Sequence, residues 1–116
     1  DNQFIHVNAE RAKNETAHGG TIAHGFLVLS LASKFAFDVL NNDSEKSISI
    51  NYGFDKVRFI SPVPANSFIR GRFTLKRVNV NRPEELRQVY DLSIEMKGSE
   101  RPAVIAEWIT LTVYDK

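Results

Sequence analysis

The most apolar stretch of the chain, GFLVLSLASKFAFDVL, has the periodicity of an α-helix. Within residues 21–40, apolar side chains recur at steps of three and four residues, and most of the other positions are apolar too. The repeating positions are Ile22, Phe26, Leu29, Ser33, Phe37 and Leu40, and Leu27, Leu31 and Phe35 fill the remaining faces. A helix that is hydrophobic nearly all round is enclosed by other elements. The pattern therefore predicts one buried helix that starts at Thr21 and is ended by the sequence Asn41-Asn42-Asp43.

After this helix the hydrophobic period changes to two, which is typical of strands buried on one face. Ile48, Ile50 and Tyr52 alternate with polar residues, and Gly53 predicts a bulge before the strand continues to Phe59. The motif SPVP ends that strand, and NRPEE forms the turn after a long strand at residues 67–80. KGSERP then separates strands at residues 90–96 and 104–114.

One helix followed by four strands with short turns predicts an α+β domain. The economical packing is a curved antiparallel sheet wrapped around the helix. We find no internal repeat, low-complexity segment or linker, and 116 residues suffice for one core but not for two. Residues 1–116 are therefore expected to form a single domain.

Composition narrows the classes of function. Fifteen basic and fourteen acidic residues give a net charge of +1, which supplies no electrostatic reason to expect nucleic acid or an anionic membrane as the main partner. Lys34 and Asp38 interrupt the apolar run, which falls short of the roughly 20 apolar residues that a membrane span needs. Cysteine is absent, which excludes disulfides, zinc–thiolate sites and cysteine nucleophiles and favours a cytoplasmic location.

The opening motif DNQFIH contains the two side-chain types best suited to moving a proton near neutral pH. Asp1 and His6 lie five residues apart, and a carboxylate and an imidazole can hold one water between them and divide the roles of base and acid. The alternative interpretation is a frayed terminal aspartate and a half-buried loop histidine, with no shared function.

The second motif, GGTIAHGF, leads into the predicted helix. With Thr21 as the N-cap, the N–H groups of the first turn would have no intrahelical partner and could bind a carbonyl oxygen or an enolate. Gly25 would then stand inside the helix, at a cost of about 1 kcal/mol relative to alanine. Close approach of a ligand would explain a glycine there, and so would close packing of another element.

Further candidates for a metal or a nucleophile give weaker signals. His6, His18 and His24 could join Asp1 in a metal site, but their spacing matches no short ligand motif, so we expect no metal. Ser33 has no histidine at helical spacing, which argues against a serine nucleophile.

Charged residues of the predicted strands are expected to be structural. A cluster of basic residues is expected to form a solvated strand face, with contact to a phosphate as the alternative, and it comprises Arg70, Arg72, Lys76 and Arg77. Glu107, next to Trp108, is also expected to have a structural role.

Three motifs in this order, DNQFIHV, GGTIAHGFLVLSL and NYGFDKVRFISPV, resemble the MaoC-like dehydratases, the (R)-specific enoyl-CoA hydratases. The resemblance covers nearly the whole chain. It implies a hot-dog fold, in which a long central helix is wrapped by an antiparallel sheet. Members of the family usually have a strand and a short helix before the aspartate, so we expect the natural chain to extend upstream of Asp1.

The resemblance also implies roles for single residues. The catalytic aspartate and histidine of the family correspond to Asp1 and His6. The backbone N–H that meets the thioester carbonyl corresponds to Gly25, and a helix serine near the site corresponds to Ser33. It further implies a substrate carried by coenzyme A or acyl carrier protein, no metal or redox cofactor, and a homodimer with the acyl thioester at the subunit interface.

The function expected from this resemblance is reversible addition of water to a trans-2-enoyl thioester, which gives an (R)-3-hydroxyacyl thioester. Asp1 would take a proton from the water, and His6 would assist delivery of a proton to the α-carbon. Two alternatives stay open: a hot-dog acyl-CoA thioesterase, and a non-catalytic subunit that binds acyl thioesters.

Overall fold

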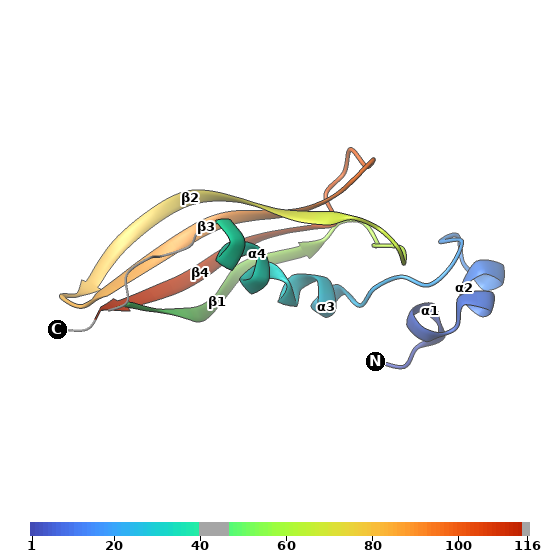
Figure 1. The fold of residues 1–116 in the computed structure, drawn as a ribbon, viewed down its shortest axis with the longest axis horizontal. Coiled ribbons are helices and arrows are strands. Elements are labelled where there is room, and N and C mark those ends of the chain that lie inside the picture. Colours follow the sequence, from blue (N-terminus) through green and yellow to red (C-terminus); the bar gives the residue numbers. More distant parts are fainter. Residues whose placement is uncertain (40–46, 115–116) are drawn as a thin grey trace.

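The computed structural model describes residues 1–39 and 47–114, which form two unequal parts (Figure 1). The larger part is an antiparallel sheet with two helices against one of its faces. The smaller part extends beyond one end of the sheet and carries two short helices, α1 (Phe4–Val7) and α2 (Ala9–Glu15). This overhang makes the molecule long, with principal extents of 58 × 26 × 23 Å.

Four strands form the sheet, as the alternating pattern predicts: β1 (Ser47–Phe59), β2 (Ile69–Arg82), β3 (Glu85–Met96) and β4 (Val104–Tyr114). Their order is β1-β4-β3-β2, and every neighbouring pair is antiparallel. The predicted bulge is confirmed, because Asn51 pairs with Thr110 whereas Gly53 pairs with Ile109, so that Tyr52 is an extra residue. Bulges increase the local twist of a strand and help the sheet to curve.

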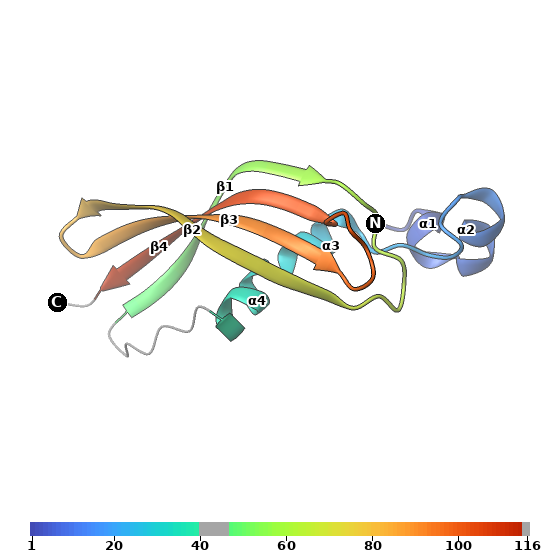
Figure 2. The ribbon, with the colours of Figure 1, turned by 90° about the horizontal axis from the view of Figure 1, so that it is seen from above.

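The predicted single helix is observed as two consecutive helices, α3 (Gly25–Ser30) and α4 (Ala32–Val39), joined at Leu31 (Figure 2). The predicted start at Thr21 is wrong. Residues 21–23 are extended and run beside residues 63–65, with a bridge between Ile22 and Pro64. Competition from these pairings explains the later helix start. The predicted helix end at Leu40, with the stop at Asn41-Asn42-Asp43, lies outside the described residues.

α3 and α4 are buried only on the face that packs against the sheet. The prediction that other elements enclose the helix on all sides is therefore wrong within the described residues. Val28 and Ala32 face the sheet and are buried, whereas 78% of Phe26 and 74% of Phe37 is exposed. The apolar pattern of residues 21–40 thus contains more hydrophobic surface than one sheet covers.

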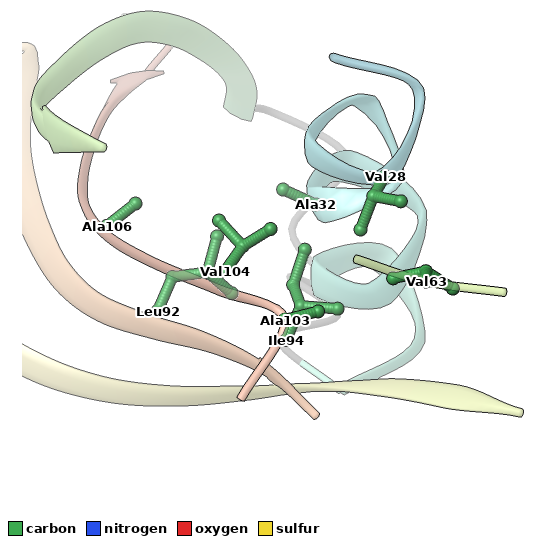
Figure 3. Close-up of a cluster of buried hydrophobic side chains, with 8 residues drawn as sticks. All are labelled: Val28, Ala32, Val63, Leu92, Ile94, Ala103, Val104 and Ala106. Atoms are coloured by element: carbon green, nitrogen blue, oxygen red, sulfur yellow. The ribbon is translucent and has the colours of Figure 1, made fainter. Parts of the chain in front are cut away.

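The core lies between these helices and the sheet (Figure 3). It contains Val28, Ala32, Val63, Leu92, Ile94, Ala103, Val104 and Ala106. Ile94 and Val104 are the largest fully buried side chains. Gly71 in β2 lets α4 approach closely, because a Cβ there would lie 2.8 Å from the Cβ of Phe35. The α+β architecture, with helices packed on a curved antiparallel sheet, is confirmed.

Candidate active site

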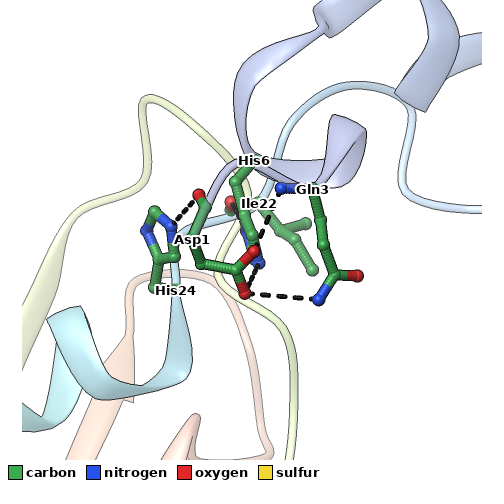
Figure 4. Close-up of polar contacts among 5 residues, drawn as sticks. All are labelled: Asp1, Gln3, His6, Ile22 and His24. Carbon is green, nitrogen blue, oxygen red and sulfur yellow. Dashed lines mark hydrogen bonds and ion pairs between the residues drawn. The ribbon is translucent and has the colours of Figure 1, made fainter.

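The two candidate acid–base residues lie together at the junction of the overhang and the sheet (Figure 4). Asp1 precedes α1, and its carboxylate accepts hydrogen bonds from the backbone N–H of Gln3 at 3.0 Å and from the Gln3 side chain at 3.3 Å. These contacts orient a carboxylate that is otherwise open to solvent, with 43% of the side chain exposed.

His6 lies on α1, and its side chain is 9% exposed. Its Nδ1 is 2.8 Å from the carbonyl oxygen of Ile22. Because a carbonyl oxygen only accepts, Nδ1 carries the hydrogen of this bond. The other ring nitrogen, Nε2, faces Asp1 and lies 3.7 Å from its Oδ2. This distance is too long for a direct hydrogen bond, but one water oxygen can bond to both atoms.

His24 also belongs to this cluster, although the sequence indicated it only as a candidate metal ligand. Its ring stacks on that of His6, with the ring centroids 4.1 Å apart and an interplanar angle of 25°. Its Nε2 lies 2.7 Å from the backbone oxygen of Asp1 and therefore donates to it. Removal from water, and secondly the charge of His6, hold the pKa of His24 below its ordinary value. The signal that could have revealed it is its place directly before Gly25.

Asp1, His6 and His24 could also be considered as a metal site, but the orientation of the two imidazole rings does not suit one. Asp1, His6 and His24 each offer a ligand atom, and these atoms lie within 4.8 Å of one another. A metal ion must lie in the plane of each imidazole that binds it, about 2 Å from the nitrogen. The two stacked planes are nearly parallel, so they do not meet at that distance. His18, the fourth residue of the candidate set, is exposed and is not part of this group.

Gly25 is the first residue of α3, not an interior residue, so the predicted cost of a mid-helix glycine does not arise. His24 is the N-cap, and its side chain makes no capping hydrogen bond to this end. N–H groups of a first turn have no intrahelical acceptor. A Cβ at Gly25 would lie 3.0 Å from the Phe59 ring, so the structure also supports the packing explanation for this glycine.

Ser33 lies apart from the other candidates. It is exposed on α4 and lines a cavity of about 520 Å³ whose other lining residues include Tyr90 and Trp108, but not Asp1, His6 or Gly25. Part of the lining is polar, since Gln88 bonds to Thr110 and Thr112. The serine that shares α3 with Gly25 is Ser30, whose hydroxyl donates to the carbonyl of Leu27 at 2.6 Å.

The basic residues of β2 lie away from this site and are ion-paired. Arg70 and Arg72 face Glu95 at 2.8 and 3.7 Å. Lys76 and Arg77 face Glu107 at 3.3 and 3.8 Å, and Lys56 faces it at 3.6 Å. The buried carboxylate of Glu107 thus joins three cations from two edge strands, which agrees with a structural role.

Comparison with known proteins identifies relatives over nearly the whole chain. The model of the MaoC-like domain matches residues 1–96. The chain is 45% identical over 115 residues to nodulation protein N of Rhizobium leguminosarum, covering 99% of this chain and 71% of that protein. It is 38% identical over 109 residues to 3-hydroxyacyl-thioester dehydratase Z of Mycobacterium tuberculosis, covering 94% of this chain and 71% of that enzyme.

Solved structures give the same fold. A protein from Archaeoglobus described as a monoamine oxidase regulatory protein matches with a TM-score of 0.80 and 26% identity, over 98% of this chain and 74% of that one. The unliganded R-hydratase PhaJ1 of Pseudomonas aeruginosa matches with a TM-score of 0.70 and 20% identity, over 100% of this chain and 72% of that one. The second likeness is one of fold. Within the described residues, no helix has the length and apolar character to cross a membrane.

Proposed function

The chain belongs to the MaoC-like domain family, and from this premise we propose that it is an (R)-specific enoyl-thioester hydratase. The proposed reaction is the reversible addition of water to a trans-2-enoyl thioester, which yields an (R)-3-hydroxyacyl thioester. The name of the mycobacterial relative, a 3-hydroxyacyl-thioester dehydratase, supports the same substrate class. The carrier is coenzyme A or acyl carrier protein.

The observation that carries the proposal is the facing pair of Asp1 Oδ2 and His6 Nε2, 3.7 Å apart. In the proposed reaction a water bonds to both atoms, and Asp1 accepts its proton as the water oxygen adds to the β-carbon. The electron pair of the double bond moves towards the thioester, which becomes an enolate. The proton that Asp1 accepted is then delivered to the α-carbon on the same face with the assistance of His6, so that one water adds as OH and H and both side chains return to their starting protonation states.

We assign the thioester oxygen to the backbone N–H of Gly25. The support is that Gly25 follows His24 directly, and His24 contacts both Asp1 and His6. An N–H fixed in the backbone stabilises enolate charge without reorganising during the reaction. The six-residue α3 adds little dipole, so the hydrogen bond itself would provide the stabilisation. The chemistry requires no metal or redox cofactor. The role of Ser33 stays a prediction, and its separate cavity gives it no support.

We further propose that the protein is a cytoplasmic homodimer. The exposed apolar surface of α3 and α4 supports a second copy as the partner, because Phe26, Leu27 and Phe37 are more than half exposed. A stable dimer would bury about 1,200 Å² or more in total. Light scattering of the complete natural chain tests this part, and a monomer at working concentrations would contradict it.

The test of the function is a product assay with the complete natural chain and trans-2-enoyl-CoA substrates of several lengths. We expect loss of the enoyl absorbance and formation of the (R)-3-hydroxyacyl-CoA. Release of free thiol without this product would instead assign a thioesterase. Saturable binding without turnover on either carrier would assign a non-catalytic subunit.

A further inference from the structure

The overhang is tied to the rest of the molecule by few contacts. In the described part of the chain, the hydrogen bonds between residues 1–16 and residues 20–114 end on Ile22 and His24. Ile22 uses its backbone only: its N–H donates to Ile5 at 2.8 Å, and its carbonyl accepts from His6. His24, by contrast, bonds to the overhang through its side chain.

His24 is placed to set the geometry of both acid–base residues at once. Its Nε2 donates to the main chain of Asp1, and its ring covers one face of the His6 ring (Figure 4). His6 is thus held at Nδ1 by Ile22 and across its face by His24. Since His24 is also the N-cap of α3, the same residue fixes this pair relative to the N–H of Gly25.

We propose that His24 is a positioning residue for the hydration reaction, and this proposal rests on the proposed function. His24 holds Asp1 and His6 at the separation that one water can bridge, and in register with the Gly25 N–H, without touching the substrate. The effect on rate is substantial because a displacement of about 1 Å can cost up to about 100-fold in turnover.

The two contacts of His24 can be removed separately by substitution in the complete natural chain. His24→Phe keeps an aromatic ring over His6 and removes the donor to Asp1. His24→Gln keeps a donor and removes the ring. His24→Ala removes both contacts. His18→Ala is the matched control, because His18 is an exposed histidine of the same segment.

The kinetic readout is kcat and KM with an enoyl-CoA substrate. We expect His24→Ala to lower kcat by about 10- to 100-fold with KM changed by less than about threefold. His24→Phe and His24→Gln should each recover part of the loss, and His18→Ala should match the wild type. An unchanged kcat in His24→Ala, or a change confined to KM, would overturn the proposal.

A second readout does not depend on activity. Amide hydrogen exchange should accelerate within residues 1–16 of His24→Ala and stay unchanged in β3 and β4, while His18→Ala behaves as the wild type. Unchanged exchange in residues 1–16 would overturn the positioning role. Acceleration throughout the sheet would also overturn it, because it would assign His24 to global stability. If the wild type hydrates no enoyl thioester, the proposed function fails, and hydrogen exchange still decides whether His24 holds the segment.

Discussion

The sheet and the N-terminal overhang are held in place by different kinds of contact. The sheet has continuous backbone ladders and a hydrophobic core in which Ile94 and Val104 have 0% and 1% of their surface exposed. In the overhang, Ala12 is the buried residue of the two short helices. Hydrogen bonds and one ring stack join this part to Ile22 and His24, in the extended segment before α3.

This difference separates stability from chemistry. Burial of apolar surface is the main source of folding free energy. Most of the buried apolar residues belong to the sheet and to the helices packed on it. The proposed acid–base pair lies in the overhang, which contributes little to the core. Substitutions in the two regions should therefore affect different properties. Those at core positions of the sheet should reduce stability, and those in the acid–base site of the overhang should reduce activity.

The largest effect on stability is expected from the core. Ile94→Ala should lower the free energy of unfolding by about 2–5 kcal/mol, because it leaves a cavity between the sheet and the helices. Val7→Ala, on α1 and 61% exposed, is the matched control and should change it by less than about 0.5 kcal/mol. Chemical denaturation measures both values. Equal losses for the two variants would show that the overhang is as much a part of the folding unit as the sheet.

A smaller effect is expected from the ion-paired carboxylate of Glu107. Contact with Lys76, and further the charges of Lys56 and Arg77, lower the pKa of Glu107 from its ordinary value of 4.5. A carboxyl group whose pKa is lower in the folded state stabilises the fold above its ordinary pKa, and this contribution is lost as pH falls through the lowered value. Wild type should therefore lose stability more steeply below pH 4.5 than Glu107→Gln. Parallel pH profiles of unfolding for the two proteins would contradict this.

The overhang should respond to a different pH range. The pKa of His24 is lower in the folded protein than its ordinary value of 6.5, so the unfolded form binds a proton more readily. The contribution of His24 to the stability of the folded overhang is thus complete above about pH 6.5 and is lost as pH falls through the lowered pKa. Amide exchange in residues 1–16, corrected for its intrinsic pH dependence, should show more frequent opening below pH 6.5. If the corrected exchange rate does not change with pH across this range, or changes in the same way in His24→Gln, then protonation of His24 does not control the opening of residues 1–16.

The smallest expected effect is that of metal removal. The rings of His6 and His24 are stacked and do not converge on one point, so exhaustive chelation should leave turnover unchanged. Turnover before and after chelation, with readdition of zinc or iron, measures this. Loss on chelation and recovery with either ion would mean that the rings rotate to form a metal site with Asp1.

The comparison of the two regions also explains what the sequence could predict. Three of the strands were located to within about two residues, and even the bulge at Gly53 was indicated, because half-buried strands impose their period on the sequence. The predicted start of the third strand at Tyr90 was wrong, since β3 begins at Glu85, inside the predicted turn NRPEE. The helix start was misplaced at Thr21, because residues 21–23 pair with residues 63–65 and no local pattern reports such a contact. The short helices α1 and α2 were not predicted, since they have little core to face.

Prediction of the candidate site was similarly uneven. The motifs identified Asp1, His6 and Gly25, and the structure brings the first two together and links them to the third through His24. The role of His24 depends on a stack with a residue 18 positions earlier in the chain, which spacing alone does not indicate. Ser33 was selected by resemblance, but it lines a cavity whose lining includes none of the other three residues.

The most direct test of the separation between stability and chemistry is to measure turnover and unfolding in the same two variants, Asp1→Asn and His6→Ala, made in the complete natural chain. We predict that each lowers hydration of a good enoyl-CoA substrate by at least about 100-fold, the usual scale for a positioned acid or base. The free energy of unfolding should stay close to that of the wild type. Turnover near the wild-type value in either variant, or a loss of activity that merely follows a loss of folded protein, would contradict the proposed mechanism.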